Sequence, residues 1–153
     1  MGLLNRYEKI RMDKDAILKA ESRNRSGGKK RMNRTIRVSA AGDILIMKRL
    51  LPGYQDVLPI REFLMQGEVR MANLETTISD GSCYASAYSG GTWLTADAKC
   101  LEDTLRYGFN FLGISNNHTM DYSYEGLAST ISELKKKDVA YAGAGKNLYE
   151  ASR

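Results

Sequence analysis

The stretch FNFLGISNNHTMDYSYEGLASTISELKKKDVAYAGAG, residues 109–145, contains the pattern that decides the fold. Residues 109–115 form a short apolar run of the length and composition of a strand. Residues 123–137 have a helical spacing of apolar side chains, and Ser123 is a residue type that caps helices. Residues 138–145 predict a second strand and a turn. A strand, a helix and a strand in this order predict two parallel strands joined by a right-handed crossover.

The rest of the body continues this alternation of strands and helices. TIRVSAAGDILI, residues 35–46, alternates and then becomes apolar, as a buried strand does. Beyond it we expect a helix at residues 55–66, a strand at 68–75 and a Ser-, Gly- and Tyr-rich loop at 79–93. A second helix is expected at 97–107, where Gly108 stops it, and a last helix at 147–152. The sequence therefore predicts an α/β fold with a mostly parallel sheet and flanking helices.

The positive charge of the chain is concentrated at its N-terminus. The net charge is +5, but residues 1–37 hold 12 Lys/Arg and 4 Asp/Glu, net +8, whereas the remaining residues hold 11 and 14, net −3. We expect residues 1–34 to be a basic leader and linker with a short helix, and residues 35–153 to be one domain, truncated in its last helix. The leader suits nucleic acid, an anionic membrane or an acidic polymer as a partner, or it is a solvated segment.

Two further features of the sequence bear on its compartment. Cys83 and Cys100 match no zinc spacing, and we expect two free thiols with at least one buried, although an exported protein would allow a disulfide. The sequence has no apolar run of about 18 residues, so it predicts no transmembrane helix, and no signal peptide is evident. From this chain alone we expect a cytoplasmic protein.

Three polar clusters lie at or just past the C-terminal ends of expected strands. They are Gly42-Asp43, residues 73–75, and residues 116–118 with Asp121 a little beyond. In open parallel sheets, ligands bind outside the carboxyl ends of the strands, so these side chains are expected to converge. Their carboxylate and amide oxygens and one imidazole suit Mn, Fe or Zn.

Each of these residues also has a structural interpretation. Asp43 could be a turn residue after its glycine, and Glu75 could cap the next segment. The paired asparagines could form a turn through their side chains. His118, the only histidine of the chain, could be structural, and Asp121 could open the next helix.

Four motifs resemble, in their order, those of the CapA family of poly-γ-glutamate capsule-synthesis proteins. They are GDILI, ANLETTIS, SNNHTMDYSYEGL and VAYAGAGKNLYEA, at residues 42–46, 72–79, 115–127 and 139–151. The resemblance covers about residues 36–151 and implies the N-terminal half of a metallophosphatase-like α/β sandwich, similar to the calcineurin-like phosphoesterases. It implies a role in capsule biosynthesis and a metal-dependent hydrolase fold.

The resemblance also implies roles for particular residues. His118 and Asp121 would be catalytic, with His118 stabilising the leaving group or the transition state. A divalent metal, Mn, Fe or Zn, would be held by Asp43, Asn73, Glu75, Asn117 and His118. The implied partners are an anionic polymer such as poly-γ-glutamate or another envelope substrate, and capsule synthase subunits.

The chain departs from the phosphoesterase pattern in three places. Asp43 is followed by Ile44 and Leu45 instead of an Asp-x-His motif, Asn116 stands in place of a glycine, and no histidine follows His118. This chain therefore does not supply a complete two-metal site. A non-catalytic polymer-binding or assembly component of a capsule-synthesis complex is the alternative function. Nucleic-acid binding ranks last, because no aromatic side chain is interleaved with the basic residues 23–37.

Overall fold

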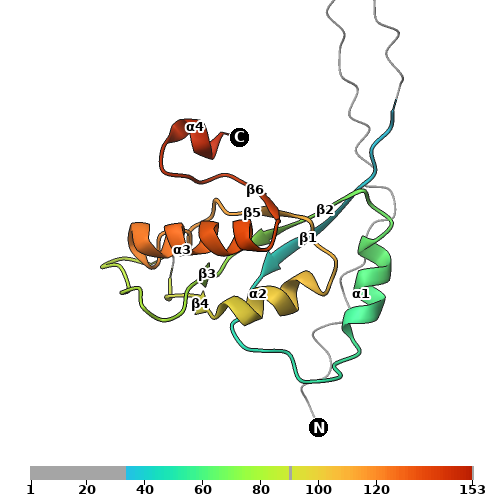
Figure 1. The fold of residues 1–153 in the computed structure, drawn as a ribbon, viewed down its shortest axis with the longest axis horizontal. Helices are drawn as coiled ribbons and strands as arrows, with labels where there is room; N and C mark the ends of the chain where they lie inside the picture. Colours follow the sequence, from blue (N-terminus) through green and yellow to red (C-terminus); the bar gives the residue numbers. More distant parts are fainter. Residues whose placement is uncertain (1–33, 90, 153) are drawn as a thin grey trace, which may run out of the picture.

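A computed structural model of the protein describes residues 34–89 and 91–152 (Figure 1). Four parallel strands form a sheet in the order β1-β2-β5-β6, and they span Val38–Ile44, Val69–Leu74, Phe111–Gly113 and Ala140–Ala142. The helices α1, α2, α3 and α4 span Val57–Leu64, Ala98–Leu105, Ser123–Lys136 and Leu148–Ala151. The predicted α/β fold with a parallel sheet and flanking helices is confirmed.

A second, two-stranded parallel sheet was not predicted from the sequence. It pairs β3, Thr77–Ile78, with β4, Thr95–Ala96. Each strand has only two residues, too few to show a period of apolar side chains. The amide of Ile78 donates to Thr130 Oγ1 at 2.9 Å, which fastens this small sheet to α3.

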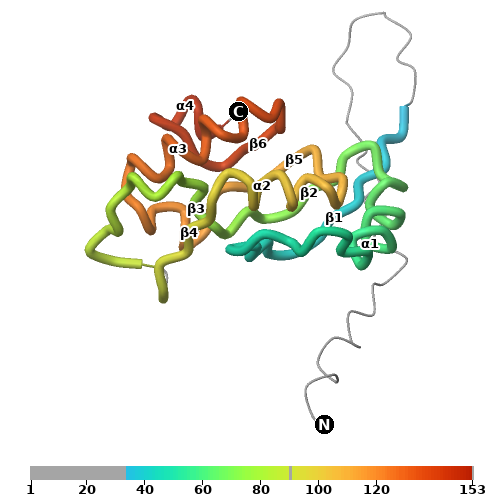
Figure 2. Tube along the Cα trace, turned by 60° about the horizontal axis from the view of Figure 1, so that its bottom comes forward, coloured from blue at the N-terminus to red at the C-terminus, as the bar shows by residue number. Residues whose placement is uncertain are grey.

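The apolar core lies on one face of the four-stranded sheet. Ala72, Leu74 and Leu112 point to this face and are almost fully buried. The helices supply the opposing side chains, namely Leu64 of α1, Leu101 of α2, and Leu127 and Leu134 of α3. Side chains alternate between the two faces of a strand, and Met71 and Phe111 on the other face are only half-buried. One face of the sheet is therefore packed by helices, and α2 lies between α1 and α3 across it (Figure 2).

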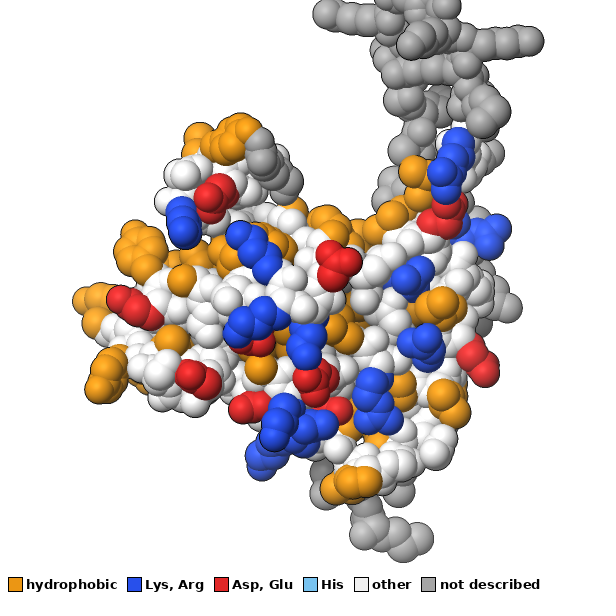
Figure 3. All heavy atoms as spheres, in the orientation of Figure 1, with side chains coloured by type: hydrophobic (Ala, Val, Ile, Leu, Met, Phe, Trp, Pro, Cys, Tyr) orange, Lys and Arg blue, Asp and Glu red, His pale blue; other side chains and the backbone are white. Residues whose placement is uncertain are grey.

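β1 is more exposed than the sequence predicted. Only Ser39 and Ile44 of this strand are buried, and Val38 keeps 38% of its surface. Within the described part of the chain, β1 has a neighbour on one side only, which is β2. The strand at residues 35–46 is therefore confirmed, but its description as buried is wrong, because an apolar sequence does not bury a strand that lies at the edge. Figure 3 shows further apolar side chains at the surface near α1.

One helix end agrees with the sequence and another differs from it. Gly108 follows α2 with a positive φ of 97° that favours glycine, as predicted. At the start of α2, which was not predicted to be capped, the Asp97 side chain accepts from the Lys99 amide. Ser123 does not cap α3. It is the first helical residue, with a φ of 56°, because a tight turn ends there with its amide donating to the Met120 carbonyl at 3.0 Å.

Both cysteines are free, as predicted, and Cys100 is buried whereas Cys83 is half-buried. Burial raises the pKa of the Cys100 thiol. None of the helices in the described residues is long and apolar enough to cross a membrane. The expected helix of the basic leader falls in residues 1–33, outside the described residues, so the division at residue 34 stays a prediction.

Candidate functional site

The register of the sheet brings the predicted strand-end residues to one edge. Asp43 near the end of β1 is paired with Asn73 near the end of β2, and Asn73 is paired with Gly113 at the end of β5. The chain continues from β5 into the segment that contains Asn116 and His118. Three neighbouring carboxyl ends therefore meet where the sequence placed the site.

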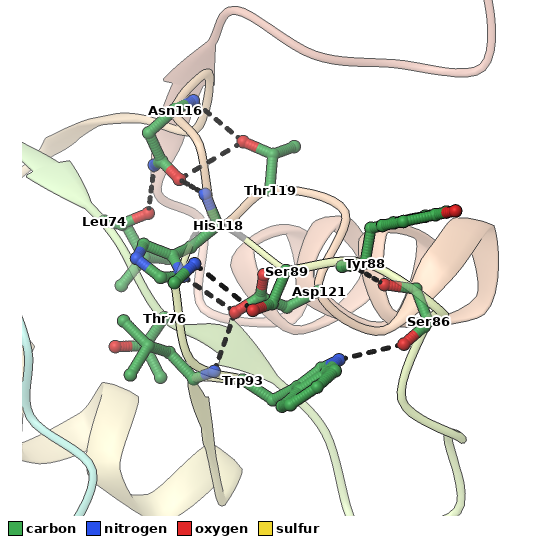
Figure 4. Close-up of polar contacts among 12 residues, drawn as sticks. Leu74, Thr76, Ser86, Tyr88, Ser89, Trp93, Asn116, His118, Thr119 and Asp121 are labelled. Atoms are coloured by element: carbon green, nitrogen blue, oxygen red, sulfur yellow. Dashed lines mark hydrogen bonds and ion pairs between the residues drawn. The ribbon is translucent and has the colours of Figure 1, made fainter.

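A chain of amide groups links these strand ends. Asn73 donates from Nδ2 to Asp43 Oδ1 at 2.8 Å, and Asn116 donates from Nδ2 to Asn73 Oδ1 at 3.0 Å and to the Leu74 carbonyl at 2.9 Å. The His118 amide donates to Asn116 Oδ1 at 2.9 Å (Figure 4). A backbone carbonyl only accepts and a backbone N–H only donates, so Leu74 and His118 fix the orientation of Asn116. That orientation in turn fixes Asn73, whose nitrogen faces Asp43.

His118 is held by a buried carboxylate. Its Nδ1 lies 2.8 Å from Asp121 Oδ2, and the Leu94 amide donates to the same oxygen at 2.7 Å. His118 is 8% exposed and Asp121 is 1% exposed. An ionised carboxylate only accepts hydrogen bonds, so Asp121 favours the imidazole tautomer with its proton on Nδ1. Nε2 is then left as the nitrogen that can accept a proton.

The turn between β5 and α3 is built from its own side chains. Asn116 accepts from the amide two residues on, which is an Asx turn, so the turn interpretation is confirmed for this asparagine. Thr119 Oγ1 donates to the Ile114 carbonyl and accepts from the Asn116 amide, both at 2.8 Å. These bonds fix the backbone on either side of His118.

Two of the residues that matter here were missed as site residues. The sequence places Asn116 in the polar cluster and in a turn but assigns it no catalytic or metal-binding role; its side chain accepts from the backbone amide two residues on, as asparagine side chains commonly do in turns. Leu94 contributes a backbone amide to Asp121 from the loop before β4. No local sequence signal predicts that contact, because the two residues are far apart in the chain and a backbone group carries no side-chain identity.

Glu75 and Asn117 take less central positions. Glu75 is half-buried and lines a small cavity together with His118. The Glu75 carboxylate forms no hydrogen bond or ion pair with any residue that the structure describes. Asn117 is exposed, between the two residues that form the turn. The structure thus joins Asp43, Asn73 and His118 through hydrogen bonds and brings Glu75 to His118 by proximity.

Comparison with known proteins identifies a family that this chain matches. The family model described as Bacterial capsule synthesis protein PGA_cap matches residues 37–153. The chain belongs to this family. The capsule biosynthesis protein CapA of Bacillus anthracis is 28% identical over 128 residues, which cover 78% of this chain and 31% of that protein. The PGA biosynthesis protein CapA of Bacillus subtilis is 38% identical over 45 residues, 29% of this chain and 12% of that protein.

A relative of Sinorhizobium fredii, the uncharacterized protein y4sH, is 29% identical over 120 residues. The match covers 74% of this chain and 25% of that protein. The chain therefore spans about a quarter to a third of the length of this relative and of the Bacillus anthracis CapA. The family resemblance inferred from the four motifs is confirmed.

Among residues 34–89 and 91–152 of this PGA_cap chain, no three His, Cys, Asp or Glu side chains lie together in a way that could hold a metal ion. Asn73 presents its amide nitrogen to Asp43, while its oxygen is taken by Asn116. Asp43 also lies on the half-exposed face of the sheet, whereas His118 shares its cavity with Leu74 from the packed face.

A second hollow, larger than the cavity beside His118, lies along α3. It has a volume of about 510 Å³ and is bounded by one face of α3 and by the segment that leads into α4. Its lining is mainly apolar, with Tyr124, Ala128 and Ile131 from α3. None of the predicted site residues lines it, so we do not place the chemistry there.

Proposed function

We propose that this chain contributes a proton-transfer site to a hydrolase of capsule synthesis that acts on an anionic envelope polymer such as poly-γ-glutamate. The observation that carries the proposal is the pairing of His118 with the buried Asp121 at 2.8 Å. Membership of the PGA_cap family supplies the capsule context. The Bacillus subtilis relative, a PGA biosynthesis protein, supports this polymer as the first candidate.

The pair is suited to general acid–base catalysis. With its proton on Nδ1, His118 accepts a proton at Nε2 from an attacking water and returns it to the leaving group. The Asp121 carboxylate holds the ring in place and stabilises the imidazolium ion that forms. The Asn116 turn fixes the backbone of His118, so that the ring does not have to be ordered when a substrate arrives.

The metal dependence implied by the family resemblance is part of the proposal, but we route no step through a metal. Asp43 and Glu75 are the carboxylates that would take part, and the described residues do not complete the centre. Both carboxylates repel an anionic polymer, so the polymer would approach more readily in the presence of a divalent cation. Further capsule-synthesis subunits are proposed partners on the family resemblance alone.

A second candidate is a non-catalytic component that binds the polymer or assembles the synthesis complex. The observation that favours it is the orientation of Asn73, which donates to Asp43 instead of offering an oxygen to a cation. In this candidate the hydrogen-bonded strand ends serve to hold the loops in shape. His118 would then be a structural histidine.

One experiment separates the two candidates. Purified protein is incubated with poly-γ-glutamate, with Mn²⁺ or with EDTA, and polymer length is followed by size exclusion while binding is followed by sedimentation. We compare the wild type with His118→Gln, and with Ser132→Ala on the exposed side of α3 as the control. If the wild type shortens the polymer, and His118→Gln binds the polymer without shortening it, the hydrolase proposal is supported. Binding without shortening supports the second candidate, and the absence of both contradicts the proposed polymer.

A further inference from the structure

Thr77, the first residue of β3, has an unsatisfied hydroxyl group. The residue is 4% exposed, and its Oγ1 is buried without a hydrogen-bond partner among the residues that the structure describes. No other buried side-chain nitrogen or oxygen in that part of the chain lacks a partner. The backbone amide of Thr77 is satisfied, because it donates to the Leu94 carbonyl at 3.1 Å. Buried hydroxyl groups are rarely left unpaired, so this one requires an explanation.

The close packing of α3 holds the Thr77 side chain in place. Gly126 of α3 faces it, and a Cβ atom at that position would lie 3.0 Å from Thr77 Cγ2 and 2.5 Å from Tyr122 Cβ. The glycine therefore lets the helix approach β3 closely. The proton of the neighbouring hydroxyl on α3, that of Thr130, is already used, since this hydroxyl donates to the Gly126 carbonyl and accepts from the Ile78 amide, both at 2.9 Å. It is not the partner of Thr77.

Thr77 lines the same small cavity as His118. The cavity volume is about 10 Å³, close to the roughly 10–15 Å³ that one enclosed water molecule needs. Nδ1 of His118 is taken by Asp121, and Figure 4 shows the other ring nitrogen directed away from Asp121, toward the side of Leu74 and Thr76. Both of these residues line the cavity, and Glu75 adds a carboxylate to its wall. The cavity is therefore polar enough to bind a water molecule.

We propose that this cavity binds one internal water molecule, which bridges Thr77 Oγ1 and His118 Nε2 and makes Thr77 a positioning residue for the histidine. The water satisfies the buried hydroxyl and donates to Nε2, which supports the tautomer that Asp121 selects from the other side of the ring. The binding of the water stands on the geometry alone. Its relevance to proton transfer rests on the proposed function of His118.

The test compares two substitutions at position 77. Thr77→Val keeps the shape of the side chain and removes the hydroxyl, whereas Thr77→Ser keeps the hydroxyl. Because His118 is the only histidine, its ring nitrogens give unambiguous ¹⁵N signals. We expect a nuclear Overhauser effect between a long-lived water and the His118 ring in the wild type and in Thr77→Ser, and its loss in Thr77→Val with a changed Nε2 shift. Thr104→Val is the control, because that buried hydroxyl donates to the Cys100 carbonyl within α2.

Two results would overturn the proposal. One is the same His118 spectrum, without a water signal, in the wild type and both Thr77 variants. The other is a higher melting temperature for Thr77→Val than for the wild type, because removing a hydroxyl that has no partner stabilises a protein, whereas removing one that binds water does not. None of these measurements uses a polymer or an activity. A failure of the proposed polymer therefore leaves this test unaffected, and the reverse also holds.

Discussion

The two parts of the candidate site differ in how far the chain itself fixes them. Around His118, the side chains are buried and each is held by neighbours, namely Asp121 from the next turn and Asn116 from the strand end. Around Asp43, the side chain is exposed, lies on the half-covered face of the sheet, and accepts a hydrogen bond from Asn73. The buried part is thus prepared before any ligand binds, whereas the exposed part is open to partners. Substitutions in the two parts should differ accordingly.

The largest effect is expected at Asp121. Asp121→Ala removes the acceptor for two buried donors, His118 Nδ1 and the Leu94 amide. We expect the free energy of unfolding to fall by about 3 kcal/mol, since each buried group left unpaired costs roughly 1–3 kcal/mol. Urea denaturation measures the loss. Asp121→Asn keeps an acceptor of the same size and should lose less; equal losses in the two variants would contradict this account of the carboxylate.

Removal of the Asn116 side chain should have the next largest effect. Asn116→Ala breaks the Asx turn and the bonds to Asn73 and Leu74, and we expect a loss of about 2 kcal/mol. Ser132→Ala is the control, because Ser132 lies on the exposed side of α3 and substitutions at the surface usually stay within about 0.5 kcal/mol. Similar denaturation midpoints for the two variants would show that the turn is not what holds the buried part.

Asp103 ties α2 to the segment after β1, and its substitution should make stability less dependent on pH. Arg49 and the Leu50 amide, after β1, bond to this buried carboxylate of α2, with Arg49 Nε at 2.6 Å. The hydrogen bond from Arg49 holds the pKa of Asp103 below its usual value. The carboxylate therefore stabilises the fold above about pH 4 and loses this effect as pH falls through its lower folded pKa.

We expect Asp103→Asn to be less stable than the wild type by about 1 kcal/mol at neutral pH, a modest loss because Arg49 is half-exposed to solvent. The difference should shrink as the solution is acidified below about pH 4, where the wild-type carboxyl becomes protonated. Denaturation curves at several pH values measure it. A difference that stays constant across that range would contradict the role given to the ion pair.

The smallest effect on stability is expected at Asp43. Asp43→Ala removes an exposed side chain, and the free energy of unfolding should change by no more than about 0.5 kcal/mol. Thermal denaturation beside the wild type checks this. A loss as large as that of Asn116→Ala would mean that the exposed part is as firmly built into the fold as the buried part, which would remove the contrast between them.

The position of the site was predictable from the sequence because parallel strands carry their polar ends to one edge. That rule predicts that Asp43, Asn73 and His118 lie at one edge, and the register of the strands brings their strand ends there. The exposure of β1 was not predictable, because the burial of a strand depends on what lies beside it and not on its own apolar content. The contact of Leu94 with Asp121 was not predictable either, since it joins a backbone amide to a carboxylate that is far away in the sequence.

The central claim is that Asp121 holds His118 with Nε2 ready to accept a proton, and the most direct test is the tautomer of that ring. Two-dimensional ¹⁵N–¹H spectra of the ring at about pH 8, where a histidine is ordinarily neutral, report which nitrogen carries the proton. We predict the proton on Nδ1 in the wild type, and a weaker preference for it in Asp121→Asn. A proton on Nε2 in the wild type would contradict the account.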